Sequence, residues 1–290
     1  MFRVILLFCL MSLHYLASGQ TDQNEVFLII RGDDMGSTNS SNDACIKSYK
    51  EGIMTSVEVM VPCAWFTQAA RLCNENPGLD VGIHLVLTSE WDDIRWRPLT
   101  CAPSLVDDEG YFHHFIWPNK NYPSSAALLE KNWSITEVER ELRAQIELGV
   151  KLIPQTSHIS AHMGCDYMDP RVETIFKKLA NEFNLTYVTN DYNVKNMDGF
   201  SQIPSYEMKL KKFMKIIDNL QPGVHMFIDH PGLNSRELTS LGHKGYNTVG
   251  QEREDVTKVF TDPGVKDRVR SKKIKLIGYK DLKKPVKKQP

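Results

Sequence analysis

Four polar clusters in this sequence combine carboxylate and imidazole side chains, and each follows or ends a short apolar run. They are Asp33-Asp34, His84, the pair His158 and His162, and Asp229-His230. Carboxylate oxygens and neutral imidazole nitrogens bind Zn²⁺ and related divalent ions, and three protein ligands leave one position for water. One acid of the first pair can ligate while the other serves as a base, and a remaining histidine can protonate a leaving group. Together the clusters predict metal-assisted hydrolysis of an amide or ester.

Each cluster alone has an ordinary structural explanation. An aspartate after a strand often caps a turn or a helix, and a lone histidine near an apolar strand is often structural. Adjacent side chains at a strand end point apart, so Asp33 and Asp34 are expected to have different roles. The metal hypothesis therefore depends on all four clusters meeting at one edge of the fold.

Short apolar runs alternate with helical patterns along the chain. Strands are expected at residues 26–30, 56–61, 79–87, 156–162, 185–190, 223–229 and 274–277, and helices at 41–51, 65–74, 134–149, 170–183 and 203–220. This alternation predicts an α/β fold with a parallel sheet and right-handed crossovers. We expect one barrel-like domain, with an open doubly wound sheet as the alternative. In both folds, functional residues gather at the carboxyl ends of the strands, where the four polar clusters lie.

The third predicted helix carries its own start and stop signals. Ser134 and Glu137 have the spacing of a capping box, in which the two side chains satisfy free backbone N–H groups of the first turn. Gly149 is expected to end this helix.

Residues 89–130 show no sustained period and are rich in tryptophan, proline and acids. Connections of this length are usually lids or binding loops. The aromatic side chains, including Trp91 and Trp117, either form walls on which sugar rings stack or pin the loop to the barrel. Both interpretations remain open at this stage.

The two ends of the chain differ in character from the rest. Residues 1–19 have a basic start, a short apolar stretch and the small residues Ala17-Ser18-Gly19, which predict a signal peptide cleaved near Gly19/Gln20. The mature protein is then expected to be secreted or periplasmic, with a domain at 20–282 and a basic tail at 283–290. No later stretch is long and apolar enough to predict a transmembrane helix.

Net charge and cysteine spacing exclude several classes of protein. The chain has 35 basic and 36 acidic residues, so it lacks the basic excess of a nucleic-acid-binding protein. No C-x-x-C pair is present, which argues against a thiolate zinc site, and disulfide pairing cannot be read from the sequence. A homodimer is compatible with the sequence.

Several motifs occur in an order and at spacings that resemble a known family. R-G-D-D-M-G, G-I-H-L-V-L-T, E-L-R-A-Q before S-H-I-S-A-H, and the late D-H-P-G are similar to the YdjC-like carbohydrate deacetylases, which include chitooligosaccharide deacetylases. The resemblance runs from about Val26 to Leu282. It implies a single deformed (β/α) barrel of parallel strands, like the glycoside hydrolase and deacetylase barrels. It also implies that an acetylated sugar or oligosaccharide, in the first place an amino sugar, is hydrolysed with one divalent metal ion, Mg²⁺ or Zn²⁺.

The resemblance also implies roles for individual residues. Asp34, His84 and His162 fall on the metal ligands, Asp33 on the general base and His230 on the general acid; Arg253 lies in an arginine-acid stretch with a role in substrate binding. Trp91 and Trp117 are further candidates for substrate binding.

This chain departs from the family at the S-H-I-S-A-H segment. The family pattern H-x-D-x-H-x-H has an acid where this chain has Ser160 and a further histidine where it has Gly164. Loss of an acid that orients a ligand histidine changes metal affinity or activity, and Asp166 is a candidate to replace it. The sequence therefore predicts a secreted metal-dependent carbohydrate deacetylase. The alternatives are a non-catalytic glycan-binding protein on the same scaffold and a metal hydrolase of another amide or ester.

Overall fold

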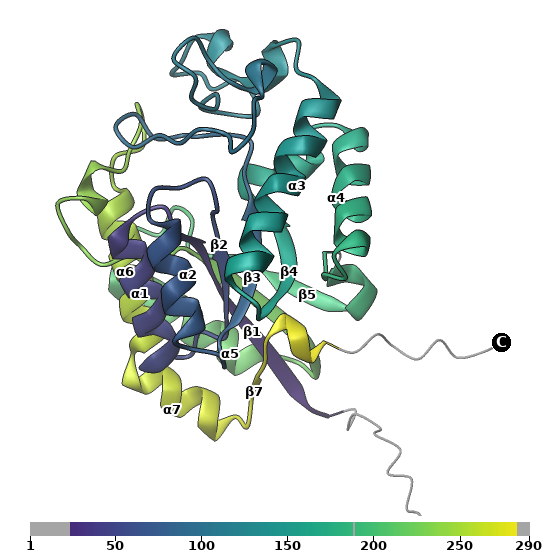
Figure 1. Ribbon diagram of the computed structural model, residues 1–290. Helices are drawn as coiled ribbons and strands as arrows, with labels where there is room; N and C mark the ends of the chain where they lie inside the picture. The colour runs from purple at the N-terminus through teal and green to yellow at the C-terminus, as the bar shows by residue number, and fades with distance from the viewer. Residues whose placement is uncertain (1–23, 188, 283–290) are drawn as a thin grey trace, which may run out of the picture.

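A computed structural model describes residues 24–187 and 189–282. The predicted signal segment 1–19 and basic tail 283–290 lie outside the described residues. The strands of the described part are β1 (Val26–Met35), β2 (Ser56–Val59), β3 (Asp80–Leu85), β4 (Thr156–Ala161), β5 (Val194–Met197), β6 (Gly223–Asp229) and β7 (Lys275–Leu276). They form one parallel sheet in the order β4-β3-β2-β1-β6-β5, with β7 paired to the start of β1 (Figure 1).

The sheet curls into an incomplete barrel, as a single side chain shows. The ring of Tyr279, which follows β7, stacks on His158 of β4 with centroids 3.6 Å apart. Its hydroxyl lies 3.0 Å from the sulfur of Met226 on β6. These two strands are far apart in the sheet order, so only a curled sheet brings both to one ring. The expected deformed parallel barrel is confirmed, and the open doubly wound alternative is wrong.

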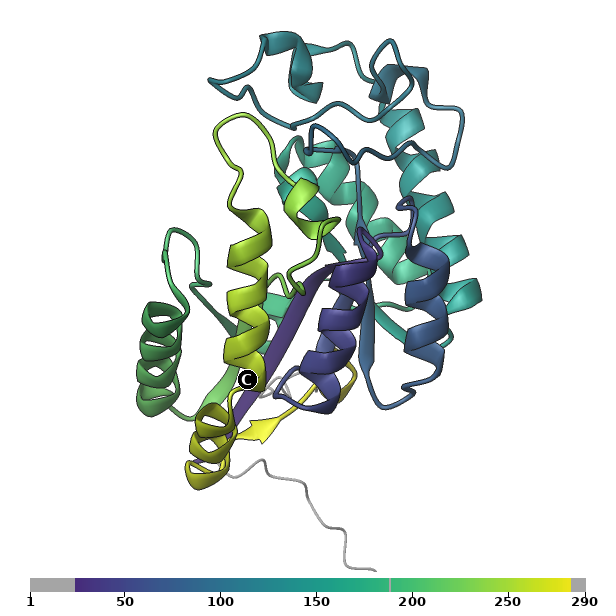
Figure 2. The same cartoon turned by 90° about the vertical axis from the view of Figure 1, so that its left-hand side faces the viewer.

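Seven α-helices in the described part surround the sheet. They are α1 (Asn39–Lys50), α2 (Phe66–Asn74), α3 (Ile135–Leu152), α4 (Pro170–Glu182), α5 (Tyr206–Asn219), α6 (Val249–Thr261) and α7 (Pro263–Ser271). α3 packs on α4, α1 on α2, and α6 on α1 and α5, so the helices form the outer layer of the barrel (Figure 2). None of these described helices combines the length and the apolar character needed to cross a membrane.

The end of β1 differs from its prediction. The apolar run predicts a strand that stops at Ile30, but β1 continues through the polar residues to Met35. Its pairing with β2 shifts register between Gly32 and Met35, as at a β-bulge. The polar end of the strand is buried because it forms the floor of a cavity and not a surface loop.

The capping box predicted for α3 is wrong. The helix does begin after Ser134, but the Ser134 hydroxyl makes no capping bond and lies 2.9 Å from the hydroxyl of Thr136. The Glu137 carboxylate instead accepts bonds from the backbone and hydroxyl of Ser104, at 2.8 and 2.7 Å. Hydrogen bonds from Ser104, in the loop before the helix, therefore replace the capping bond expected of Glu137.

Gly149 does not end α3, which continues to Leu152. A Cβ at position 149 would lie 2.4 Å from the side chain of Ile83 on β3. The glycine therefore serves close packing of the helix on the sheet.

Two helices and one strand were missed between residues 189 and 271. The strand predicted at 185–190 is wrong: Thr186 forms only an isolated bridge with His158, and the paired strand is β5. α6 escaped prediction because its buried face includes Arg253, Asp255 and Thr257, and these polar residues hide the apolar period.

Residues 89–130 form a folded excursion above the carboxyl ends of the strands (Figures 1 and 2). Its helical elements are short 3₁₀ turns, at Pro103–Leu105, Ser124–Ala126 and Leu128–Glu130, and two isolated β-bridges join Val106 to Phe112 and Phe115 to Ala127. Phe112 and Leu128 are fully buried, and the Glu141 carboxylate of α3 accepts bonds from the backbone of Leu99 and Thr100. The excursion is thus anchored to the barrel by its own core and by α3.

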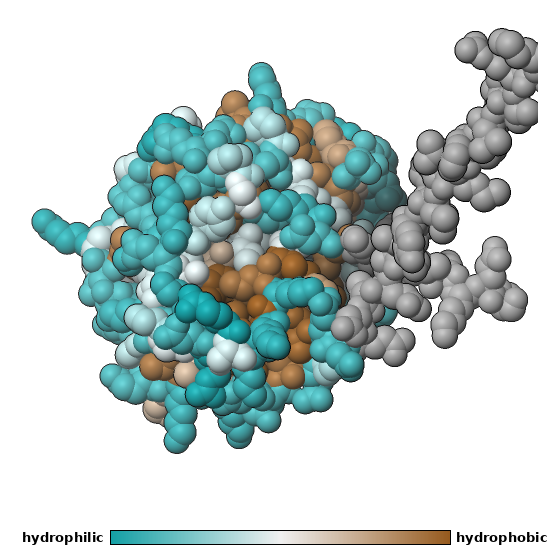
Figure 3. Space-filling model, turned by 90° about the horizontal axis from the view of Figure 1, so that it is seen from below, coloured by the Kyte–Doolittle hydropathy of each residue, from teal (hydrophilic) through white to brown (hydrophobic). Residues whose placement is uncertain are grey.

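The end of the barrel opposite the excursion carries an apolar surface patch among hydrophilic residues (Figure 3). Apart from the main core, Ile29, Val194, Met226 and Tyr279 form a small separate apolar core. Figure 3 shows apolar surface on this end, beside the residues drawn in grey. Buried polar groups occur near the strand starts too, where the Asp80 carboxylate accepts bonds from the hydroxyls of Ser56 and Ser157, at 3.2 and 2.7 Å.

The cysteines of the described part are unpaired. Cys45, Cys63, Cys73 and Cys165 are buried and Cys101 is exposed, and none forms a disulfide. Burial raises the pKa of the four buried thiols. They pack as small apolar side chains.

Candidate active site

A cavity of about 860 Å³ opens at the carboxyl ends of the strands. Seven of the eight site residues predicted from the sequence line it. These are Asp33, Asp34, His84, Trp91, His162, His230 and Arg253. They come from β1, β3, α6 and the segments that follow β3, β4 and β6, so the parallel sheet brings distant parts of the chain to one place.

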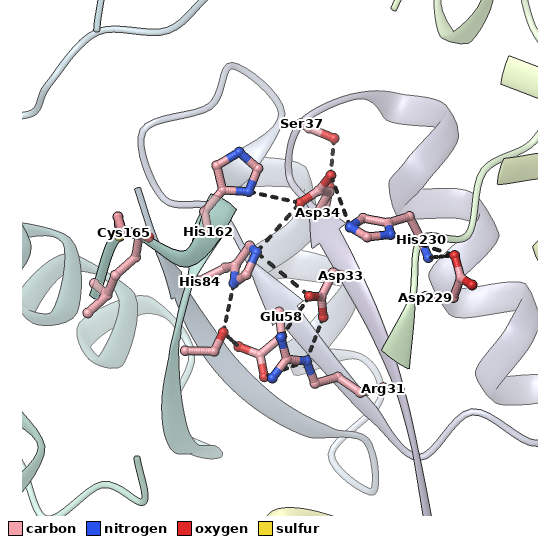
Figure 4. Close-up of polar contacts among 12 residues, drawn as sticks. Arg31, Asp33, Asp34, Ser37, Glu58, His84, His162, Cys165, Asp229 and His230 are labelled. Carbon is pink, nitrogen blue, oxygen red and sulfur yellow. Dashed lines mark hydrogen bonds and ion pairs between the residues drawn. The ribbon is translucent and has the colours of Figure 1, made fainter. Parts of the chain in front are cut away.

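Both acids of the Asp33-Asp34 pair face this cavity. In a regular strand they would point to opposite sides, and the sequence prediction assumed so. Asp34 instead has a φ of 67°, in the left-handed region that aspartate tolerates better than most residues, next to the shift in β1 pairing. The local distortion turns two adjacent carboxylates toward the same site (Figure 4).

Asp34, His84 and His162 form a compact group of potential metal ligands. The Oδ1 atom of Asp34 lies 3.7 Å from Nε2 of His84 and 3.4 Å from Nδ1 of His162. One ligand atom from each residue lies within 4.8 Å of the other two. All three side chains are buried, and Oδ1 of Asp34 has no hydrogen-bond partner. A buried, unpartnered carboxylate oxygen facing two imidazole nitrogens fits a divalent cation.

The far nitrogen of each histidine is held by another side chain. Nδ1 of His84 lies 2.7 Å from the hydroxyl of Ser160, and Nε2 of His162 lies 3.0 Å from the carboxylate of Glu90. Metal-bound histidines usually have such partners, which fix the ring and its tautomer. Glu90 was missed by the sequence analysis, although an acid directly before Trp91 and after a strand was a usable signal.

The charges around this group favour a cation. Burial lowers the pKa of His84 to about 4, which keeps its ring neutral near neutral pH. Burial also disfavours charge on His162, but the carboxylates of Glu90 and Asp34 outweigh it and raise its pKa to about 10. Burial opposes ionisation of Asp34, yet Arg253 and the two nearby histidines hold its pKa well below the usual range. Positive charge between Asp34 and Glu90 is therefore stabilised.

Asp33 is held by an arginine. Its two carboxylate oxygens accept bonds from Nε and Nη2 of Arg31, at 2.6 and 2.7 Å. Oδ2 also lies 3.8 Å from Nε2 of His84, so Asp33 borders the ligand group without joining it. This bidentate fork fixes the carboxylate at the cavity wall.

His230 lies across the cavity from the other two histidines. Its Nε2 is 3.9 Å from Oδ2 of Asp34 and its Nδ1 is 3.6 Å from Asp229. The side chain is 42% exposed. Burial of the ring disfavours its charge, but Asp34 and Asp229 outweigh this effect and raise the pKa of His230. An accessible imidazole with a raised pKa is suited to proton donation.

Arg253 and Trp91 form one side of the cavity. Nη2 of Arg253 donates to Oδ2 of Asp34 at 2.5 Å, whereas its buried Nη1 has no partner. The guanidinium lies 5.7 Å from the centre of the Trp91 ring, which also stacks on His243. The structure therefore places Arg253 against a predicted metal ligand as well as in the predicted binding site.

Trp117 does not line the cavity. It is 44% exposed and lies near Gly164, where a Cβ would be 3.6 Å from the tryptophan ring. Met163, the residue before Gly164, does line the cavity. Trp117 thus lies beside the cavity rim and not within it.

Two residues considered in the sequence analysis, His158 and Asp166, and one further histidine lie elsewhere. His158 is fully buried, stacked on Tyr279 and bonded to Glu58, so it is a structural residue. Asp166 does not replace the acid missing at Ser160, because its carboxylate accepts a bond from Tyr187 at 2.6 Å, outside the cavity. His113 lines a separate, smaller hollow in the excursion.

Comparison with known proteins gives a consistent result. A family model described as YdjC-like protein matches residues 27–271. The chain is 34% identical over 187 residues to a carbohydrate deacetylase of Thermus thermophilus, covering 64% of this chain and 61% of that protein. It is 28% identical over 269 residues to a carbohydrate deacetylase of Brevibacillus brevis, and this match covers 88% of this chain and 99% of that protein. A chitooligosaccharide deacetylase of Yersinia enterocolitica is 32% identical over 162 residues, and this match covers 56% of this chain and 58% of that protein.

A solved structure supports the fold. A protein from Enterococcus faecalis V583, described as a candidate cellobiose-phosphate cleavage protein, superposes with a TM-score of 0.69 and 24% identity. The match covers 88% of this chain and 98% of that one.

Proposed function

Because this chain belongs to the YdjC-like family, we propose that it hydrolyses acetyl groups from an acetylated carbohydrate in the cavity at its strand ends. The observation that carries the proposal is the convergence of Asp33, Asp34, His84, His162 and His230 there. A non-catalytic glycan-binding protein would have no need for an unpartnered carboxylate oxygen beside two imidazole nitrogens.

Asp34, His84 and His162 would hold one divalent ion, Zn²⁺ or Mg²⁺. When bound, such an ion polarises the acetyl carbonyl and lowers the pKa of a water molecule. The two nitrogens and one oxygen favour a borderline ion such as Zn²⁺ over Mg²⁺, which prefers oxygen ligands.

The protein's own residues supply the proton transfers. Asp33 accepts a proton from the attacking water, and the Arg31 fork holds its carboxylate in place. The water oxygen bonds to the acetyl carbon, and the bond from that carbon to the sugar nitrogen or oxygen then breaks. His230 gives its proton to this leaving atom, so the products are acetate and the free sugar amine or hydroxyl.

Substrate binding is proposed for the wall of Arg253 and Trp91, with Trp117 beside the rim. The free Nη1 of Arg253 can donate to a sugar or acetyl oxygen. The exposed face of Trp117 suits the apolar face of a sugar ring outside the cavity.

The direct test is acetate release from acetylated chitooligosaccharides by the purified protein, with and without a chelator, alongside elemental analysis. We expect release that stops on chelation and returns with Zn²⁺, and about one metal ion per chain. Bound metal without acetate release would indicate another amide or ester substrate. Glycan binding without metal or acetate release would contradict the proposal and favour the binding-protein alternative.

His230→Gln is expected to lower kcat by about 10²- to 10³-fold without loss of metal, because glutamine cannot donate a proton as an acid. The side chain is partly exposed, so the fold should tolerate the change. Measuring kcat on two substrates sharpens the test. An acetyl ester with a good leaving group, which needs little protonation, should lose much less activity than an acetylated amine. An equal loss on both would contradict the acid role.

A further inference from the structure

Three buried side chains from neighbouring strands form a hydrogen-bonded chain that ends at a predicted metal ligand. Nδ1 of His84 on β3 lies 2.7 Å from the hydroxyl of Ser160 on β4. That hydroxyl lies 2.5 Å from the carboxylate of Glu58 on β2. Strand register explains the meeting, because His84 pairs with Ser160 and Glu58 pairs with Gly82, two residues before His84.

The chemistry of the three groups fixes the direction of these bonds. An ionised carboxylate only accepts, so Ser160 must donate its single O–H to Glu58. The serine oxygen then accepts from N–H at Nδ1 of His84. A neutral imidazole carries one N–H, so Nε2 keeps a free lone pair, and Nε2 is the atom 3.7 Å from Oδ1 of Asp34.

Glu58 is fully buried in the barrel, and other side chains hold its carboxylate in place. It has no exposed surface, and its other oxygen lies 2.6 Å from Nε2 of His158 and 3.6 Å from Nε of Arg31. Burial disfavours its charge, but His158 and Arg31 outweigh this and lower its pKa to about 2. Gly82 leaves the space, since a Cβ there would lie 2.5 Å from the Glu58 carboxylate.

We propose that Glu58, acting through the hydroxyl of Ser160, is the positioning carboxylate that presents Nε2 of His84 to the metal. The inference rests on the proposed function only for the presence of a metal at Asp34, His84 and His162. It also explains the serine at position 160, because the acid absent there is supplied from β2, on the far side of β3 in the sheet.

The sequence contains one sign that Glu58 has a special role, namely its position in an apolar strand. Ser56–Val59 is a fully buried strand, and a glutamate in such a strand is costly unless it is paired and hydrogen-bonded. The sequence alone does not show which residues satisfy it, because its partners lie 27 to 102 residues away along the chain.

The test compares Zn²⁺ affinity, measured by competition with a chromophoric chelator, in three single variants. Ser160→Ala breaks the chain and should weaken Zn²⁺ binding by about 10- to 100-fold. Ser160→Thr keeps the hydroxyl and should restore binding to within a few-fold of the unmodified protein. Ser157→Ala is the matched control, because its hydroxyl lies on the same strand and bonds to Asp80 and His158 but not to His84.

A double-mutant cycle then assigns the effect to Glu58. If Glu58 acts through Ser160, Glu58→Gln should weaken Zn²⁺ binding in the unmodified protein but add little in the Ser160→Ala background. Circular dichroism and Tm of the metal-free proteins identify variants that fail to fold. Should Glu58→Gln fail to fold, the comparison of Ser160→Ala with Ser160→Thr and Ser157→Ala decides alone.

The opposite outcomes are equally clear. Unchanged Zn²⁺ affinity in Ser160→Ala, an equal loss in Ser157→Ala, or fully additive losses in the cycle would each overturn the inference. Failure of the unmodified protein to bind Zn²⁺ would overturn the metal site on which the inference rests. Metal binding without acetate release would instead count against the proposed function alone, since every readout here is binding.

Discussion

His162→Ala is expected to abolish acetate release and metal binding together while the barrel remains folded. The variant removes one of three ligand atoms from the group that includes Asp34 and His84. Loss of the ion removes several kcal/mol of transition-state stabilisation, and each 1.36 kcal/mol is a factor of ten in rate. We therefore expect kcat to fall by about 10³-fold or more, with metal content below one-tenth of the original.

The matched control for this prediction is His225→Ala. His225 is another buried histidine, on β6, but its Nε2 lies 2.7 Å from the carbonyl oxygen of Gln221 and it does not line the cavity. This variant should keep its metal and its activity even if its Tm falls. Intact activity or stoichiometric metal in His162→Ala would show that the metal assignment is wrong.

Asp33→Asn is expected to lower kcat by about 10²- to 10⁴-fold with the metal retained. Asparagine has nearly the same size but cannot take a proton from water, and it accepts through only one oxygen from the Arg31 fork. Because Asp33 lies outside the ligand group, metal content and Zn²⁺ affinity should change little. Single-turnover rates and elemental analysis of the same preparation separate the two effects.

Asp166→Asn is a suitable comparison for Asp33→Asn. It changes a buried carboxylate that is bonded to Tyr187 and lies outside the cavity. Its activity should stay near that of the unmodified protein. A loss of metal in Asp33→Asn would make Asp33 a ligand, and undiminished kcat would place the base elsewhere.

The sequence determined the class of fold and the end of the barrel at which the chemistry lies. Alternating apolar runs and helical patterns predict parallel strands, and the carboxyl ends of parallel strands meet at one edge. Asp33, Asp34, His84, His162 and His230 could therefore be assigned to one site before the fold was known, and the structure brings them into one cavity. Strand order was not needed, because each residue lies close to a strand end.

Local sequence pattern does not separate residues whose roles depend on non-local contacts. His158 and His162 have similar surroundings in the sequence, yet one stacks on Tyr279 inside the barrel and the other lines the cavity. The capping box of α3 failed because Ser104 claims Glu137. The local pattern of residues around a helix start does not show that a side chain from a distant loop will take the hydrogen bond of the capping residue.

The supporting carboxylates were decided by tertiary structure alone. Glu58 reaches His84 only because β2, β3 and β4 pair in one register, and Glu90 reaches His162 because it follows β3 and His162 follows the adjacent strand β4. Even the direction of Asp34 depends on a positive φ at the distorted end of β1. A sequence records which groups can do chemistry. Which atoms meet is fixed by hydrogen bonds and packing between segments tens of residues apart, and no local pattern encodes those distances.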